Sequence, residues 1–149
     1  MMKDQRGFTL VELVMAIAIT GLIVSVLGTA IFQIVNVTGY GNDRMIATHE
    51  LQNAAHWVCL DGQGASSASG GTELVLTLPD SSSITYRLEG TKLRRTADGL
   101  KMTLARNISS ISFSVEDRTV TMEIVSTPRG RQGVVEQGVY RVHLRPAEG

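Results

Sequence analysis

The sequence predicts an α+β fold, in which a long N-terminal helix, membrane-spanning in its first half, packs on an antiparallel β-sheet. Two patterns predict it. An apolar run of 28 residues starts at Phe8 and is followed by a second helical pattern. Short segments of alternating hydrophobicity then continue to the C-terminus. The composition agrees, because only 5% of the residues are aromatic while Ser, Thr, Val and Ile are common, which favours strands joined by polar turns.

The totals limit the function classes. A chain of 149 residues suits one compact domain with one appendage. Basic and acidic residues number 14 each, whereas nucleic-acid-binding proteins are usually basic, so nucleic acid is not an expected partner. The single cysteine, Cys59, excludes an intrachain disulfide.

The apolar run from Phe8 to Val35 is long enough to cross a membrane. As a helix it would reach ~42 Å, and a bilayer core needs about 20 residues. Its hydrophobic residues surround the helix, whereas a helix on a soluble core keeps a polar face. Lys3 and Arg6 precede it and favour a cytoplasmic N-terminus. We therefore expect a single pass through the cytoplasmic (inner) membrane, with the C-terminal domain outside.

Glu12 is the only charged residue of this run, and three interpretations stay open. A secretory signal peptide could be cut after Gly28-Thr29-Ala30, but its apolar region would be shorter and uncharged. A plain membrane anchor would let Glu12 reach the interface. A functional glutamate is the default reading of an ionisable residue inside a membrane segment.

The third interpretation gains support from Gly7, which lies directly before the run. A cut after Gly7 would leave a free amine on Phe8. That amine and Glu12 could pair between adjacent subunits, which would relieve two charges that are unfavourable alone in apolar surroundings. The sequence thus predicts assembly through the helix.

Small residues form a stripe on one face of the same helix. Ala18, Gly21, Ser25 and Gly28 follow one another at spacings of three, four and three. Small faces let membrane helices approach closely, although the general abundance of such residues in membrane helices explains the stripe equally well.

The segment GFTLVELVMAIAITGLIVSVLG, with its short basic leader, resembles the N-terminus of type IV prepilins and of the related type II secretion pseudopilins. The resemblance rests on Gly7, Phe8, Thr9, Leu10 and Glu12 and covers about a fifth of the chain. It implies a pilin-like fold and cleavage by a membrane prepilin peptidase between Gly7 and Phe8. It also implies N-methylation of Phe8 and neutralisation of a neighbour's amine by Glu12. The implied partners are this peptidase, other pilin or pseudopilin subunits, an inner-membrane assembly platform and membrane lipid.

Four segments follow from these patterns: a leader at 1–7, a transmembrane and assembly helix at 8–36, an amphipathic continuation at 37–61 and a β-rich domain at 62–149. The continuation would bury one face, formed by Ala47, Leu51, Ala54, Ala55 and Val58. We expect the long helix to have a flexible joint near Gly39. Residues 62–72 are expected to form a Gly/Ser-rich loop outside the core.

Six strands are predicted, at 73–78, 83–90, 92–96, 110–117, 119–126 and 139–146. Their alternation indicates a single meander with one apolar face. The preceding helix is the available cover for that face.

Other candidate sites have weaker support. His49, His56 and Cys59 could share a helix face, but one cysteine and few ligands favour ordinary helix residues, so no metal or cofactor is expected. No catalytic motif indicates an enzyme. The cations Arg87, Lys92, Arg94, Arg95, Lys101 and Arg106 favour a solvated strand face over a phosphate-binding patch.

These observations predict a type IV filament subunit, a pilus or pseudopilus component in secretion, adhesion, motility or DNA uptake. The single cysteine and the lack of an acidic cluster after Glu136 depart from major subunits and favour a minor one. The alternative is a single-pass membrane-anchored extracytoplasmic binding module, which predicts that the leader is kept.

Overall fold

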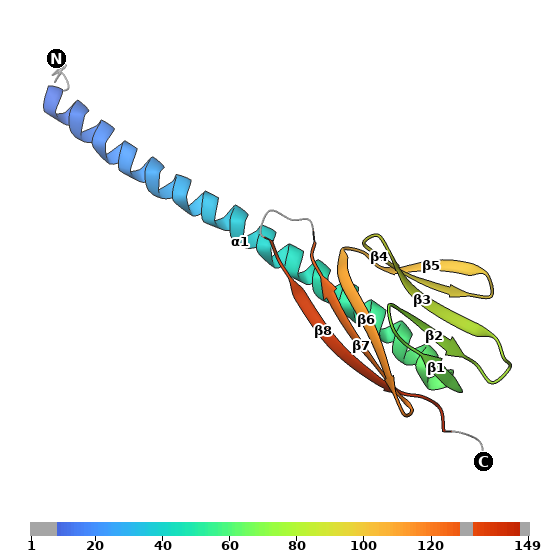
Figure 1. Cartoon of the computed structure of the whole chain (residues 1–149). Helices are drawn as coiled ribbons and strands as arrows, with labels where there is room; N and C mark the ends of the chain where they lie inside the picture. Colours follow the sequence, from blue (N-terminus) through green and yellow to red (C-terminus); the bar gives the residue numbers. More distant parts are fainter. Residues whose placement is uncertain (1–8, 129–132, 147–149) are drawn as a thin grey trace, which may run out of the picture. The chain divides into compact units, whose positions relative to one another are not determined.

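The structure, a computed structural model, describes residues 9–128 and 133–146. The chain divides into two compact units, Met1–Thr38 and Gly39–Gly149, which are described separately. Helix α1 (Leu10–Gly64) contributes to both units, and eight strands follow it (Figure 1).

The first unit is the apolar part of α1. Its large hydrophobic side chains, from Leu10 to Val37, are between 52% and 78% exposed. The helix is long and apolar enough to cross a membrane, as the sequence predicts. The expected joint does not interrupt the helical pattern, because α1 continues through Gly39 and Gly41, although the two units meet at this point in the sequence.

The second unit contains two antiparallel sheets. The five-stranded sheet has the order β1-β2-β3-β4-β5 and the three-stranded sheet the order β6-β7-β8. Their strands are β1 (Ser67–Ser69), β2 (Glu73–Thr77), β3 (Ser83–Glu89), β4 (Lys92–Ala97), β5 (Leu100–Ala105), β6 (Ile108–Glu116), β7 (Thr119–Ser126) and β8 (Glu136–His143).

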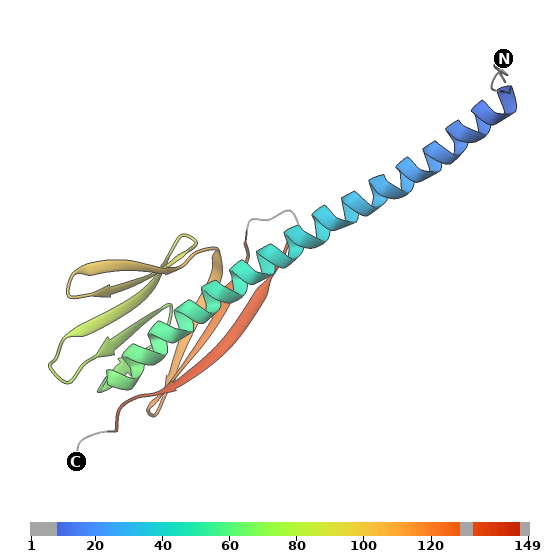
Figure 2. The ribbon, with the colours of Figure 1, turned by 180° about the vertical axis from the view of Figure 1, so that it is seen from behind.

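Both sheets turn their apolar faces toward the second half of α1, which passes in front of the orange and red strands β6, β7 and β8 in Figure 2. All five helix residues predicted to be buried are buried, namely Ala47, Leu51, Ala54, Ala55 and Val58. Opposite them lie Leu74, Leu76, Ile84, Tyr86 and Leu93 from the five-stranded sheet, and Phe113, Val120, Met122, Ile124 and Val142 from the three-stranded sheet. One core therefore joins the helix to both sheets, and the predicted α+β class is confirmed.

The two sheets are joined at two points. Gly71 and Phe113 exchange main-chain hydrogen bonds of 2.8 and 3.0 Å, and the main-chain N–H of Ile108 donates to Thr91 O at 3.0 Å. A Cβ added at Gly70 would lie 2.7 Å from the carbonyl oxygen of Phe113, so glycine permits this close approach.

The prediction of a single meander is wrong, because the strands divide between two sheets. The helix supplies the reason. The Asn53 side-chain amide donates to Leu104 O, and the Glu50 carboxylate accepts from the main-chain N–H of Arg106. These bonds engage the backbone around the end of β5. Asn107 follows with a φ of 56°, which turns the chain away before β6.

Three element predictions also need correction. Residues 62–72 are not one loop, because α1 extends to Gly64 and β1 follows. Strand β5 was not predicted, since Leu100 and Lys101 blur its alternation and are both exposed. Strand β8 begins three residues earlier than expected and ends at His143.

Candidate functional site

Thr9 and Glu12 form the start of α1. The main-chain N–H of Thr9 donates to Glu12 Oε2 at 3.0 Å, and the Thr9 hydroxyl donates to the same oxygen at 2.9 Å. In return, the main-chain N–H of Glu12 donates to Thr9 Oγ1 at 3.3 Å. This is a capping box, in which an N-cap threonine and a glutamate at the third helical position satisfy each other's main-chain donors.

The capping box leaves part of the Glu12 carboxylate available. Both bonds from Thr9 end on Oε2, and no hydrogen bond or ion pair within the described residues uses Oε1. The carboxylate also lies in the first helical turn, at the positive end of the helix dipole. It is therefore held beside the helix start with one oxygen open to a further donor.

Sequence reasoning identified Glu12 but missed the role of Thr9. The signal was the Thr-x-x-Glu spacing directly before an apolar run, which is the sequence form of a capping box. Gly7 and Phe8, the predicted cleavage and methylation residues, lie outside the described residues.

The four small residues of the predicted stripe lie on α1 in the first unit, where all are exposed. A Cβ added at Gly21 or Gly28 would meet nothing within 4 Å. A shallow apolar hollow of about 410 Å³ lies at Gly21, and its lining residues are Ala16, Ile17, Thr20, Gly21 and Val24.

The hydroxyl groups near this stripe bond within the helix. Thr20 donates to Ala16 O at 2.7 Å and Thr29 donates to Ser25 O at 3.0 Å. Because the hydroxyl donors of Thr20 and Thr29 are satisfied within the helix, these two side chains can face lipid or another apolar helix without an unpaired donor.

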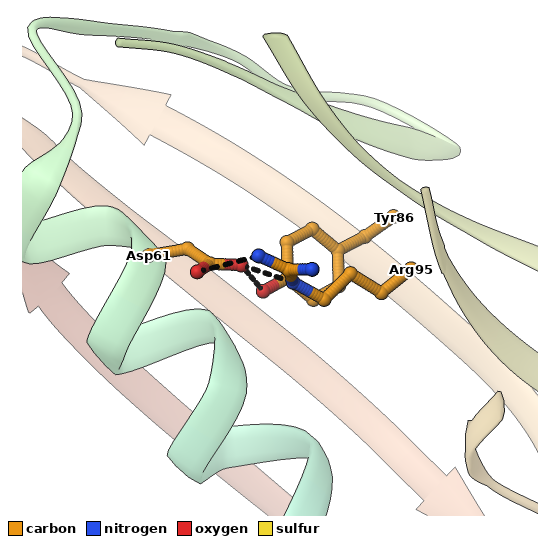
Figure 3. Close-up of polar contacts among 3 residues, drawn as sticks. All are labelled: Asp61, Tyr86 and Arg95. Atoms are coloured by element: carbon orange, nitrogen blue, oxygen red, sulfur yellow. Dashed lines mark hydrogen bonds and ion pairs between the residues drawn. The ribbon is translucent and has the colours of Figure 1, made fainter. Parts of the chain in front are cut away.

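A polar cluster in the second unit links α1 to the five-stranded sheet (Figure 3). Arg95 binds Asp61 through two bonds, Nε to Oδ2 at 2.6 Å and Nη2 to Oδ1 at 3.0 Å. The Tyr86 hydroxyl donates to Asp61 Oδ2. Tyr86 and Arg95 are cross-strand partners on β3 and β4, and the Arg95 guanidinium lies 5.1 Å from the centre of the Trp57 ring.

Tyr86 and Arg95 have raised pKa values in this cluster. Burial, reinforced by the bond to Asp61, raises the pKa of the Tyr86 hydroxyl. The hydrogen bonds to Asp61 raise the pKa of the Arg95 guanidinium. Asp61 is 8% exposed and both of its carboxylate oxygens are engaged. We interpret the cluster as an internal ion pair that fixes the end of α1 to the sheet, because Asp61 is buried and both of its oxygens bond to side chains of the same fold.

The histidine and cysteine residues considered as metal ligands do not form a site among the described residues. His49 and His56 are exposed, and burial raises the pKa of the half-buried Cys59 thiol, which lowers its reactivity. Within the described ranges, no group of three or more His, Cys, Asp and Glu side chains could hold a metal ion.

The predicted solvated face between residues 87 and 106 needs one correction. Arg95 points inward to Asp61 rather than outward. Three other cations pair with acids on the outer side: Arg87 lies 3.9 Å from Glu73, while Arg94 and Lys101 lie 3.6 and 3.5 Å from Glu89. These pairs argue against a continuous phosphate-binding patch.

Comparison with known families identifies the N-terminal segment. Residues 2–28 match the family described as prokaryotic N-terminal methylation motif. This motif is the cleavage and methylation signal of type IV prepilins, and it supports a type IV pilin-like precursor. In the described part of the chain, α1 is long and apolar enough to serve as a membrane anchor. The match includes Gly7, Phe8, Glu12 and the small-residue stripe. The chain has no significant match among curated proteins or solved structures.

Proposed function

We propose that this chain is a subunit of a type IV filament, a pilus or a pseudopilus. It is made as a membrane-inserted precursor, cut by prepilin peptidase after Gly7, methylated on Phe8 and assembled through its N-terminal helix. The observation that carries the proposal is the methylation motif at residues 2–28. The proposed role is structural, with no catalytic activity of its own.

The exposed apolar surface of α1 supports assembly through this helix. Its large hydrophobic residues are at least 52% exposed within the first unit. Such a surface needs lipid before assembly and the helices of neighbouring subunits after it. The hollow at Gly21 and the small residues around it let a second helix approach closely.

The capping box supports a specific role for Glu12. Cleavage after Gly7 places a positive amine on Phe8, next to Thr9. We infer that the Glu12 carboxylate, whose Oε1 has no hydrogen-bond partner among residues 9–128 and 133–146, accepts a hydrogen bond from the amine of an adjacent subunit. Thr9 positions the carboxylate toward the helix start. The pair neutralises two charges that would each be unfavourable alone in an apolar filament core.

The basic leader supports the membrane orientation. Lys3 and Arg6 precede the span and favour a cytoplasmic N-terminus, which places the second unit outside the inner membrane. The partners are then the peptidase, an inner-membrane assembly platform and other subunits. The single cysteine, which cannot form a disulfide loop, favours a minor subunit.

Three variants in the native host test the assembly role. Glu12→Gln keeps an amide oxygen for the Thr9 bonds but removes the charge. Thr9→Ala removes the hydroxyl and keeps the charge, and Thr9→Ser is the matched control. The measurements are leader removal, by mass, and incorporation into sheared filaments.

We expect all three variants to be processed. Glu12→Gln should lower incorporation by about tenfold or more, which corresponds to about 1.4 kcal/mol of lost pairing. Thr9→Ala should lower it less, and Thr9→Ser should resemble the wild type. Normal incorporation of Glu12→Gln would refute the charge pairing. A wild-type chain that keeps its leader would instead support the membrane-anchored binding module.

A further inference from the structure

The outer face of the five-stranded sheet carries an excess of positive charge. The strand register aligns Glu73, Arg87 and Arg94 across β2, β3 and β4. Glu89 and Lys92 are partners at the ends of β3 and β4, and Lys101 lies on β5. This face, named here the basic face, therefore presents four cations against two carboxylates.

The outer face of the three-stranded sheet carries the opposite excess. Its register places Glu116, Thr119 and His143 in one row across the sheet. The next rows are Ser114, Thr121 and Arg141, then Ser112, Glu123 and Val139. Two carboxylates thus oppose one guanidinium on this acidic face. An open hollow of about 520 Å³ lies on it, lined mainly by short Ser and Thr and by the charged side chains.

The two faces also differ in how many of their acidic side chains make ion pairs. On the basic face both acids are already paired, and Glu89 is shared by Arg94 and Lys101. On the acidic face neither Glu116 nor Glu123 makes an ion pair within the described residues. In the turns, Asp98 adds one negative charge beside the basic face, and the charges of Asp117 and Arg118 cancel beside the acidic face, so neither face changes sign.

We propose that the acidic face of one copy binds the basic face of a neighbouring copy, with Lys92 and Lys101 of one copy entering the hollow beside Glu116 and Glu123 of the next. Two different, complementary faces on one subunit make a head-to-tail contact, which repeats into an open assembly rather than closing as a dimer. The charges select the partner face and its register. This inference rests on the proposed filament function.

The shapes of the side chains agree with this contact. Ser114, Thr119 and Thr121 are short and leave the hollow open, while lysine has a long flexible stem that can place its ammonium beside a carboxylate. Exposed pairs are individually weak and screened by salt, so the contact orients subunits that the helices already hold together.

Charge reversal in the full chain tests this contact. Lys92→Glu with Lys101→Glu makes both faces acidic, and Glu116→Lys with Glu123→Lys makes both basic. The four-fold combination exchanges the two signs and restores complementarity. Arg106→Glu reverses an exposed cation beyond the end of β5 and serves as the control.

The contact itself is measured by disulfide cross-linking in filaments. Thr96→Cys on the basic face and Thr121→Cys on the acidic face are combined with Cys59→Ala, so that a head-to-tail contact gives a ladder of cross-linked subunits. We expect either double reversal to lower cross-linking by about fivefold or more, and the four-fold combination and the Arg106→Glu control to keep it. Leader removal and protease resistance of the second unit confirm folding.

Cross-linking that is unchanged in the double reversals, or not restored by the combination, would overturn the contact. A single dimer band from Thr121→Cys alone would also overturn it, because that band reports a two-fold contact. If filaments form normally and respond to Glu12→Gln, such results refute only this contact. A wild-type chain that is neither processed nor assembled refutes the filament function itself.

Discussion

The two units of the molecule differ in the exposure of their apolar side chains. In the first unit the large hydrophobic side chains from Leu10 to Val37 are at least 52% exposed. In the second unit one face of the same helix is buried against two sheets, and Ala47 and Ala54 are fully covered. The second unit therefore has its own core, whereas the first needs lipid or neighbouring subunits to cover it.

The acids of α1 show the same contrast. Among the described residues Glu12 bonds only to Thr9, through Oε2, while both oxygens of Asp61 are engaged by Arg95 and Tyr86. An acid with an open oxygen on an apolar surface is available to a partner. An acid that is fully bonded within a core serves the fold. With the proposed function, this difference places assembly in the first unit and stability in the second.

The largest expected effect lies at the proposed cleavage site. Gly7→Val should leave the leader attached to nearly all of the protein, because a branched side chain would obstruct the peptidase where glycine does not. The first unit then keeps its leader and has no free Phe8 amine. Mass analysis of the membrane fraction measures this, and complete processing of the variant would contradict the assigned cut.

Loss of the Asp61–Arg95 ion pair should strongly lower the stability of the second unit. Asp61→Ala should lower the free energy of unfolding by about 3–5 kcal/mol, because it leaves the Arg95 cation without its carboxylate. Asp61→Leu combined with Arg95→Met should cost less than this single change. Pulse proteolysis in urea of the detergent-solubilised chain measures both. A cost of Asp61→Ala below about 1 kcal/mol would contradict this role.

Matched glycine substitutions separate the two units. Gly70→Ala should destabilise the second unit by about 1–3 kcal/mol, since its Cβ would lie 2.7 Å from Phe113 O. Gly21→Ala should not destabilise the helix and should favour it by about 0.5–1 kcal/mol, because its Cβ meets nothing within 4 Å.

The Gly21 substitution, which should not destabilise the protein, should instead affect filament assembly. Gly21→Ala should reduce filament incorporation if neighbouring helices pack at its hollow, while the folding of the second unit stays normal. If Gly21→Ala is incorporated as well as the wild type, the small-residue stripe has no role in helix packing within the filament. Proteolysis and filament shearing on the same samples provide both measurements.

The smallest expected effect is an alkaline pH dependence of the second unit. The pKa of Tyr86 is raised in the folded state, while an unfolded tyrosine ionises near about pH 10. The stability linked to Tyr86 is therefore full below about pH 10 and is lost as the pH rises through the folded pKa. Above about pH 10, the free energy of unfolding should fall more steeply with pH for the wild type than for Tyr86→Phe. Parallel pH profiles would contradict this linkage.

Local patterns predicted much of the fold. The buried face of α1 from Ala47 to Val58 follows from helical spacing, and the bounds predicted for β7 agree with the structure. The division into two sheets could not be predicted, because we relate it to bonds from Asn53 and Glu50 to Leu104 and Arg106, at and just after the end of β5. Those bonds join residues more than 50 positions apart in the sequence.

The site was predictable to a similar extent. Glu12 stands out as a lone charge, and the Thr-x-x-Glu spacing would have identified its cap. The tie of Asp61 to Arg95 spans 34 residues, so no local motif marks it. The alternation of β4 does place Arg95 on the same face as Leu93, which is the one hint that this cation points inward.

The most direct test of the filament account is the intact mass and N-terminal sequence of the protein extracted from membranes of its native host. A filament subunit processed after Gly7 begins at Phe8 and carries one additional methyl group on its amine. A chain that still begins at Met1, or one that begins at Ile31 after removal of the apolar run, would contradict it.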